Sequence, residues 1–163
     1  RVAEFYKKSF DIHIDSRDNH LLLEHADTPY PPGQMIRVRD SAIYLSEHMH
    51  EVPVLIIPCI LGRVEEAGVM AQAGLYGSIL PAAWSLMLAL RARGLGSAWT
   101  TVHLQYEREV ATLLDIPDNI TQTALLPVAY FKGTDFKPAK RLPSQNFTHW
   151  NVWGQQRQGV DAS

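Results

Sequence analysis

The first third of the chain changes between periodic and irregular hydrophobic patterns. Over residues 1–10, apolar side chains recur near helical spacing among lysines and a glutamate, which predicts an amphipathic helix. From Asp11 to Arg39 the chain is mostly polar, rich in proline and without a sustained period. We therefore expect a long irregular segment there, which is a candidate lid. Asp40 then offers an N-cap for a short helix that ends at Met49.

Two nearly continuous apolar runs have the composition of buried strands. Val52–Cys59 is rich in β-branched residues and is bounded by proline and charge, which predicts a strand buried on both faces. Thr121–Phe131 is a similar run. Its inner Pro127 indicates an edge strand or a local break in pairing, because proline cannot donate to the ladder. The short segment Ser97–Val102 also favours a strand.

Between these runs lies a helix that is apolar all round. It is expected to follow a glycine-rich stretch, Gly62–Gly77, and to span Ser78–Arg93 with Pro81 in its first turn, before a Gly-Leu-Gly turn. Since it has no wide polar stripe, we place it in the middle of the domain. A second, amphipathic helix is expected with Tyr106, Val110, Leu113 and Leu114 on one face, ending at Ile116–Asn119. Strands that alternate with helices in this way predict a mixed α/β or α+β architecture.

Composition narrows the class of protein. The chain has 163 residues, of which 46% are hydrophobic and 20% charged, and this fits one globular domain over residues 1–163. A net charge of −2 gives no overall field that would draw the molecule to nucleic acid or to an anionic membrane. The longest apolar stretch, Ile79–Leu90, is shorter than the ~20 residues of a membrane-spanning helix. We therefore predict no nucleic-acid partner and no membrane segment.

Cysteine and histidine content argues against disulfides and a metal site. The single cysteine, Cys59, lies in an apolar run, which predicts an inert packed thiol and a reduced, cytoplasmic setting. Among seven histidines only His48 and His50 are close in sequence, and no third ligand falls at a recognised metal spacing. The chain starts at Arg1, without an initiator methionine or the layout of a signal peptide.

A basic cluster after the last predicted strand is the first candidate site. Lys137, Lys140 and Arg141 lie close together between prolines, and their side chains are the ones that bind phosphate oxygens. The cluster therefore suits the phosphate of a cofactor. The alternative is a solvated basic loop, which is the commoner structure for such a charge run.

The second candidate site is the stretch Trp99-Thr100-Thr101 after the apolar helix and its glycine turn. Threonine hydroxyls and backbone N–H groups at a strand end can bond the polar edge of a flat heterocycle, while an aromatic ring packs on its apolar part. The alternative is an ordinary strand end built from β-forming residues.

The order of these features resembles the flavin-dependent nitroreductase family, from about Val52 to Trp153. Several motifs in the same order are more specific than any one of them. The matching segments are the helix and Gly-Leu-Gly turn of Tyr76–Gly96, then Trp99–Thr101, Leu114–Pro117, Leu126–Tyr130, Lys137–Arg141 and His149–Trp150.

The resemblance implies a fold, a cofactor and a partner. The expected fold is α+β, with a sheet flanked by helices, in an intertwined homodimer that holds one FMN in each of two sites at the subunit interface. Trp150 and Trp153 match a C-terminal arm, from about residue 144, that wraps the partner subunit. The family's N-terminal segment, which supplies further FMN contacts, has no counterpart before Arg1, so the domain is expected to be N-terminally incomplete.

The resemblance also implies roles for the candidate residues. Trp99, Thr100 and Thr101 would lie along the flavin near its reactive nitrogen. The FMN phosphate would be held by Lys140 and Arg141, with Lys137 at a position where the family spacing varies. Tyr76, before the central helix, would line the substrate site or serve as a packing residue.

The implied activity is transfer of hydride from NAD(P)H through the flavin to a nitroaromatic, quinone or similar flat acceptor, with no catalytic side chain required. Two alternatives stay open. One is a flavin-binding or flavin-sequestering protein without turnover. The other is a reductive dehalogenase-like enzyme, because Trp99-Thr100-Thr101 also resembles the threonine-rich stretch of flavin dehalogenases.

The phosphate assignment can be tested by mutation. Lys140→Ala combined with Arg141→Ala should lower FMN affinity at least tenfold, because each substitution removes a charge-assisted hydrogen bond worth about 1.5 to 3 kcal/mol. The measurement is a titration with FMN. Unchanged affinity in the double variant would exclude these residues as the phosphate ligands.

Overall fold

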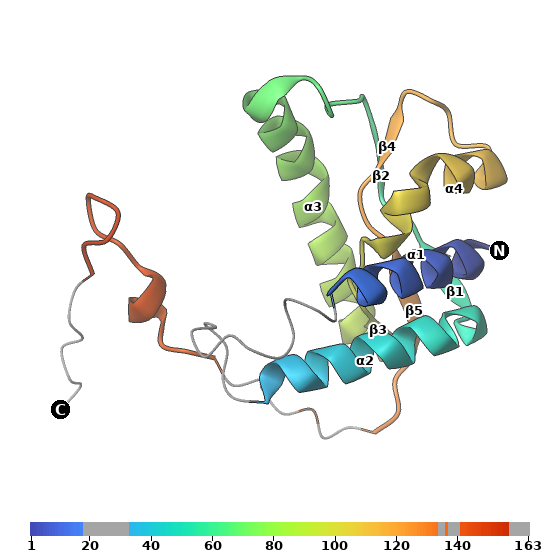
Figure 1. Ribbon diagram of the computed structural model, residues 1–163, viewed down its shortest axis with the longest axis horizontal. Helices are drawn as coiled ribbons and strands as arrows, with labels where there is room; N and C mark the ends of the chain where they lie inside the picture. Colours follow the sequence, from blue (N-terminus) through green and yellow to red (C-terminus); the bar gives the residue numbers. More distant parts are fainter. Residues whose placement is uncertain (18–32, 134–135, 137–140, 157–163) are drawn as a thin grey trace.

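Helices alternate with short strands along the chain (Figure 1). The computed structural model describes residues 1–17, 33–133, 136 and 141–156. Its α-helices are α1 (Val2–Arg17), α2 (Gln34–His48), α3 (Gly68–Ala92) and α4 (Glu107–Leu114), and its short 3-10 helices are η1 (Met49–Glu51), η2 (Val102–Tyr106) and η3 (Ser144–Phe147). The strands are β1 (Val54–Ile56), β2 (Cys59–Leu61), β3 (Leu95–Ser97), β4 (Ile120–Gln122) and β5 (Leu126–Tyr130).

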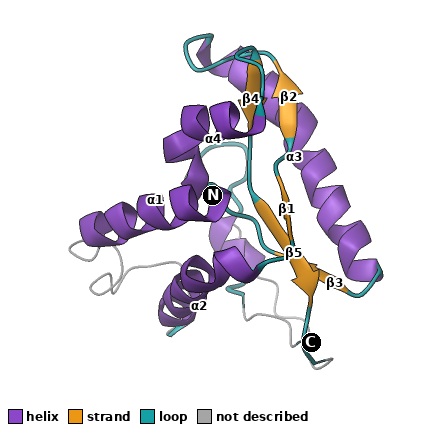
Figure 2. Cartoon of the chain, turned by 90° about the vertical axis from the view of Figure 1, so that its right-hand side faces the viewer, coloured by secondary structure: helices purple, strands orange, loops and turns teal. Residues whose placement is uncertain are grey.

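The strands form two small antiparallel ladders. One has the order β1-β5-β3, and the other pairs β2 with β4. Figure 2 shows these strands between α3 on one side and α1, α2 and α4 on the other. Separate antiparallel strands flanked by helices confirm the α+β prediction.

Each predicted long strand is divided in two. Between the pairs Ile56↔Leu126 and Cys59↔Gln122, two residues of the first run face three of the second, which is the geometry of a one-residue bulge. At this point the Pro58 carbonyl accepts hydrogen bonds from the N–H and the hydroxyl of Thr123, both at 3.0 Å. The chain therefore passes from one ladder to the other without leaving these backbone groups unpaired.

Of the two alternatives predicted for Pro127, the edge strand is wrong, because β5 is the central strand of its sheet, and the local break in pairing is confirmed. The proline is tolerated there because β1 pairs with Leu126–Val128 while β3 pairs only from Val128 onward, so the β3 side of Pro127 lies outside the ladder. The first run is also not buried on both faces, since Val54 is 49% exposed.

The core of the chain lies between the sheet and the pair α1 and α2. Tyr6 and Phe10 of α1 pack with Met49 and Leu125, and partly buried apolar side chains of α2, β1 and η2 surround them. The Tyr6 and Phe10 rings stack with centroids 6.2 Å apart. This core therefore occupies the face of the sheet opposite α3 (Figure 2).

The N-terminal helices are longer than predicted. A helix at the start is confirmed, but α1 continues to Arg17 and α2 already begins at Gln34, so the expected irregular segment is wrong at both ends. Residues 18–32 lie outside the described part of the chain. Asp40 is not an N-cap but lies inside α2, which instead starts after Gly33 in the left-handed conformation, with φ 73°.

The segments after the central helix are partly as predicted. The β-leaning stretch Ser97–Val102 is shifted, because the strand is Leu95–Ser97 and the 3-10 helix η2 starts at Val102. The second amphipathic helix is confirmed as α4, with Val110 fully buried. It ends at Asp115 in the left-handed conformation, where the Asp115 N–H bonds the Ala111 carbonyl.

The apolar helix α3 differs most from expectation. It begins ten residues before Ser78, so Pro81 lies in its interior, and the helical glycines Gly74 and Gly77 cost only about 1 kcal/mol each relative to alanine. Ala83 is its only buried residue, so its predicted place in the middle of the domain is wrong. Among the described helices only α3 is long and apolar enough, by length and composition, to cross a membrane.

Candidate functional site

The stretch Trp99–Thr101 follows β3, and its middle residue is anchored in the core. The Thr100 N–H bonds the Leu125 carbonyl at 3.1 Å, and the Leu125 N–H bonds the Thr100 carbonyl at 2.7 Å. The Thr100 hydroxyl donates to the Tyr6 hydroxyl at 3.2 Å and accepts from the Val102 N–H at 3.4 Å. All the polar groups of Thr100 are therefore used within the chain.

The two neighbours of Thr100 are exposed. Trp99 is 36% exposed, and Thr101 is exposed as the residue before η2. The Thr101 hydroxyl makes no hydrogen bond to any residue that the structure describes, while its carbonyl accepts from the Leu104 N–H at 3.0 Å. On a fixed backbone, an exposed indole can pack on the face of a flat heterocycle such as a flavin, and an exposed hydroxyl can bond its polar edge.

The other predicted site residues are not joined to this stretch by described contacts. Tyr76 is half-buried in the N-terminal half of α3, and no hydrogen bond or ring contact between it and Trp99–Thr101 is found in the described part of the chain. Arg141 is exposed and takes part in another contact, and no described contact joins it to Trp99–Thr101. Lys137 and Lys140 lie outside the described residues.

An apolar cavity of about 340 Å³ opens beside the C-terminal half of α3. The Arg91 guanidinium lies over two phenylalanine rings, 4.2 Å from the centroid of Phe131 and 4.4 Å from that of Phe136. Trp84, Leu88 and Arg91 share one helix face, since they are spaced by four and three residues. The lining residues are Trp84, Met87, Leu88, Arg91, Leu95, Gly96, Ser97, Phe131 and Phe136.

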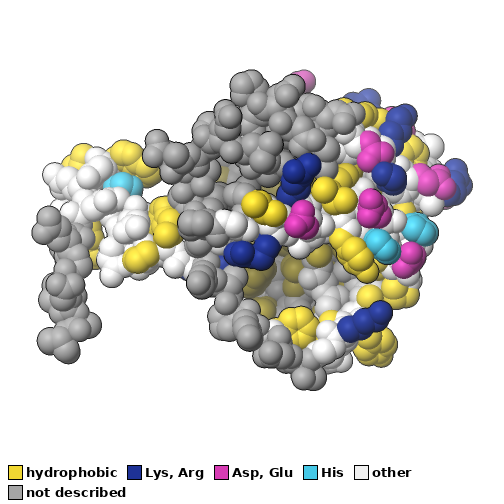
Figure 3. Space-filling view, turned by 60° about the horizontal axis from the view of Figure 1, so that its bottom comes forward, with side chains coloured by type: hydrophobic (Ala, Val, Ile, Leu, Met, Phe, Trp, Pro, Cys, Tyr) yellow, Lys and Arg dark blue, Asp and Glu magenta, His cyan; other side chains and the backbone are white. Residues whose placement is uncertain are grey.

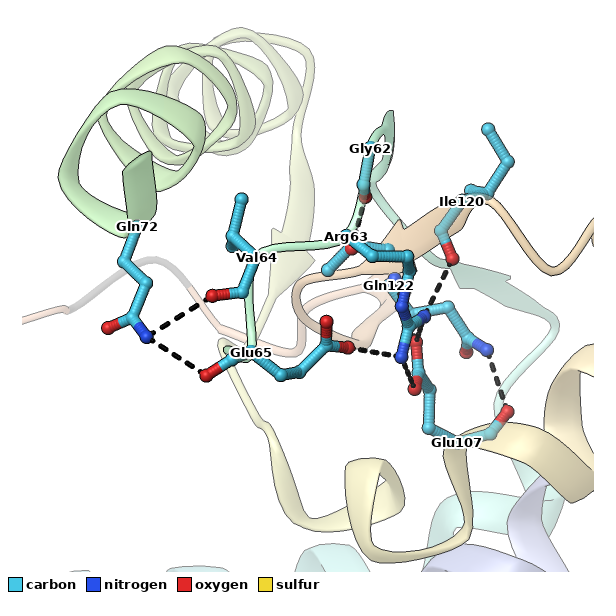
Figure 4. A network of polar contacts seen from close by, with 9 residues as sticks. Gly62, Arg63, Val64, Glu65, Gln72, Glu107, Ile120 and Gln122 are labelled. Atoms are coloured by element: carbon cyan, nitrogen blue, oxygen red, sulfur yellow. Dashed lines mark hydrogen bonds and ion pairs between the residues drawn. The ribbon is translucent and has the colours of Figure 1, made fainter. Parts of the chain in front are cut away.

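A charged network ties the start of α4 to the segment between β2 and α3 (Figure 4). Arg63 donates to both carboxylate oxygens of Glu107, at 2.7 and 2.9 Å, and to the Ile120 carbonyl at 2.9 Å, and it also pairs with Glu65. The hydrogen bond from Arg63 lowers the pKa of Glu107, and the same contact raises the pKa of Arg63. With its charges paired, the network is structural, although it borders a wide polar cavity of about 830 Å³.

His103 is a titratable group two residues after the Trp99–Thr101 stretch. Its ring is fully buried in η2, and neither ring nitrogen has a hydrogen-bond partner among the described residues. Burial lowers its pKa to about 4, against a weaker opposing effect of Glu107. A neutral, enclosed imidazole cannot reach a bound substrate, so His103 is a core residue.

Cys59 departs from its predicted environment. Its side chain is exposed rather than packed. Desolvation and the nearby Glu107 raise the pKa of the Cys59 thiol. The group is therefore mainly a thiol at neutral pH, while the predicted packing that would make it inert is wrong.

The sequence matches the model of one protein family. The model of the nitroreductase family matches residues 11–130, a stretch that contains α3, β3, Trp99–Thr101 and β5. The chain belongs to the nitroreductase family. It is therefore an oxidoreductase in the general sense of this family, which generally uses flavin and NAD(P)H.

The match to solved structures is more distant. A crystal structure from Parabacteroides distasonis ATCC 8503, provisionally named an NADH dehydrogenase/NAD(P)H nitroreductase, is 20% identical in sequence with a TM-score of 0.47. The comparison covers 90% of this nitroreductase-family chain and 68% of the other chain. No curated protein matches the sequence significantly.

The C-terminal segment of this family member stands away from the body and carries exposed hydrophobic side chains (Figures 1 and 3). Val152 is 61% exposed and Trp153 87% exposed, although Trp153 stacks on His149 with ring centroids 4.3 Å apart. The His149 ring also accepts the Gly154 N–H at 3.1 Å. The segment therefore has local order while its apolar surface remains uncovered within this chain.

Sequence reasoning missed two features of the site. The hydrogen bond between Thr100 and Tyr6 joins residues 94 positions apart, and no local pattern announces it. The cavity around Arg91 was also missed, because the sequence explains a basic residue in the last turn of α3 by the helix dipole alone. The aromatic residue Phe131 at the end of an apolar run, which the structure shows half-buried, was the one available signal.

The buried imidazole predicts acid sensitivity. The folded-state pKa of His103, about 4, lies below the ordinary 6.5, so the unfolded chain binds the proton more tightly. The associated stability is fully present above about pH 6.5 and declines as the pH falls. By pH 4.5, where Glu107 begins to contribute, the free energy of unfolding should drop by about 2 kcal/mol.

Urea unfolding at several pH values measures this loss. His103→Leu should flatten the slope of stability against pH between 6.5 and 4.5, whereas the exposed His50→Gln should leave it unchanged. An equal slope in the wild-type chain and the His103 variant would show that another group titrates.

Proposed function

We propose that the chain is an FMN-dependent oxidoreductase that passes hydride from NAD(P)H to a nitroaromatic, quinone or similar flat acceptor. The observation that carries the proposal is the contrast between buried and exposed residues in Trp99–Thr101. Thr100 is buried and hydrogen-bonded in the core, while the Trp99 ring and the Thr101 hydroxyl are exposed and accessible to a ligand. The stretch lies within the residues matched by the family model.

The chain's own residues bind and orient the cofactor. Trp99 offers an apolar face for the flavin ring, and the Thr101 hydroxyl and the adjoining backbone offer hydrogen bonds to its polar edge. The exposed Arg141, with Lys137 and Lys140, would hold the phosphate. When bound, FMN supplies the hydride chemistry, so no side chain has to act as acid or base. Tyr76 would line the acceptor site.

The proposed assembly is a cytoplasmic homodimer whose two copies meet through α3. Trp84 and Leu88, 58% and 55% exposed, lie on one face of this helix, and the apolar cavity opens on the same face. α3 is also held to the body, since it leads directly into β3 and its Gln72 amide donates to the Val64 carbonyl at 3.2 Å. A second copy therefore suits this surface better than a lipid bilayer does. The exposed side chains of the C-terminal segment would pack on the same partner.

Redox turnover tests the activity. The purified chain loaded with FMN should lose its visible flavin absorption when NADH or NADPH is added without oxygen, and regain it when a quinone is supplied. The measurement is an anaerobic titration in a spectrophotometer. Bound flavin that stays oxidised with both nucleotides would contradict the oxidoreductase proposal and favour a flavin-sequestering protein. Halide release from a halophenol under reducing conditions would favour the dehalogenase alternative.

The dimer is tested by placing a charge on α3. Leu88→Glu should weaken self-association at least tenfold, because an unpaired carboxylate would have to be buried at the interface. The matched control is Ile36→Glu on α2, where the side chain is 59% exposed on the other side of the sheet. Sedimentation velocity over a range of concentrations reads out both variants. Equal association of Leu88→Glu and the wild-type chain would exclude this face.

A further inference from the structure

Two buried hydroxyls of α1 bond to Thr100 of the Trp99–Thr101 stretch and to Val102, the residue that follows it. Tyr6 and Ser9 are spaced by three residues, so they share one face of the helix, and they are only 2% and 1% exposed. This face packs on η2, which follows the stretch in the chain. α1 is therefore the element that covers the inner side of the candidate flavin site.

Tyr6 fixes the middle of the stretch. Its hydroxyl accepts the hydrogen bond of the Thr100 hydroxyl at 3.2 Å, while its ring is packed on Phe10 and in the core with Leu125. Leu125 is also the residue whose backbone pairs with Thr100. Thr100 is thus held from two directions, by the helix through its side chain and by the Leu125 backbone.

Ser9 fixes Val102, the residue that follows the stretch. Its Oγ donates to the Val102 carbonyl oxygen at 2.7 Å and lies 2.9 Å from Oε1 of Gln105. Thr101 therefore stands between two residues that are each held by α1. The Thr101 backbone cannot shift without breaking one of these buried contacts.

We propose that Tyr6 and Ser9 are positioning residues, which set the place of Trp99 and Thr101 and thereby the affinity and the reduction potential of the bound flavin. The proposal rests on the proposed function. Neither residue reaches the ligand itself. They act through Thr100 and Val102, whose own polar groups are already bonded within the chain.

Tyr6→Phe is the test, because it keeps the packed ring and removes only the acceptor for Thr100. The variant should bind FMN about threefold to tenfold more weakly, which is the effect expected for loss of one buried hydrogen bond. Its bound flavin should also show a shifted midpoint potential. In the flavin-free chain, amide hydrogen exchange at residues 99–102 should become faster.

Tyr106→Phe is the matched control. Tyr106 belongs to η2 and its ring stacks on Phe5 of α1, with centroids 5.7 Å apart, so it also joins the same two elements. Its hydroxyl makes no hydrogen bond to a residue in the described part of the chain. This variant should match the wild-type chain in FMN affinity, flavin potential and exchange at residues 99–102.

The readouts separate the proposal from the function on which it rests. If the wild-type chain binds and turns over FMN while Tyr6→Phe leaves affinity and potential unchanged, the positioning role is wrong and the proposed function stands. If the wild-type chain binds no FMN, the proposed function and the positioning role both fail. Faster hydrogen exchange in Tyr6→Phe would then show only that the hydrogen bond between Tyr6 and Thr100 stabilises the fold. Weaker binding and a shifted potential in Tyr6→Phe alone support the proposal.

Discussion

The constraint on which the structure depends is that α3 stays largely exposed in a single copy of the chain. This helix has 25 residues and an almost wholly apolar composition, yet Ala83 is its only buried side chain. The core that the chain does form, around Tyr6, Met49 and Leu125, lies on the opposite face of the sheet. Since burial of apolar surface is worth about 25 cal/mol per Å², the exposed side of α3 represents a large unused contribution to stability.

The candidate site lies at the boundary between the core and the exposed surface. Thr100 belongs to the core, through its backbone pairing with Leu125 and its hydroxyl bond to Tyr6. Trp99 and Thr101 are exposed, so a ligand or a second subunit can reach them. An anchored residue between two presented ones gives a preorganised surface, which lowers the cost of ordering the site when a flat ligand binds.

The sequence predicts the kinds of element better than it predicts their surroundings. The apolar helix with its glycine turn and the amphipathic helix α4 follow from hydrophobic periodicity, which leaves α/β and α+β both open. The choice of α+β follows from the family resemblance. Periodicity shows that α3 is apolar all round but not which surface covers it, so its predicted burial within the chain was wrong. The division of the strands at Pro58 and the central position of Pro127 depend on a bulge and on strand order, which are set by tertiary pairing.

The most direct test of the proposal that a second copy covers α3 is hydroxyl-radical footprinting of the native protein. The oxidation rate of each residue is compared with its rate in the urea-unfolded chain. In one copy, Trp84 on α3 is 58% exposed and Tyr44 on α2 is 64% exposed, so on this basis alone both should be oxidised readily. The account predicts that Trp84 is strongly protected and Tyr44 is not, because the proposed second copy would cover α3 and leave α2 open. Equal reactivity of the two side chains at high protein concentration would contradict it.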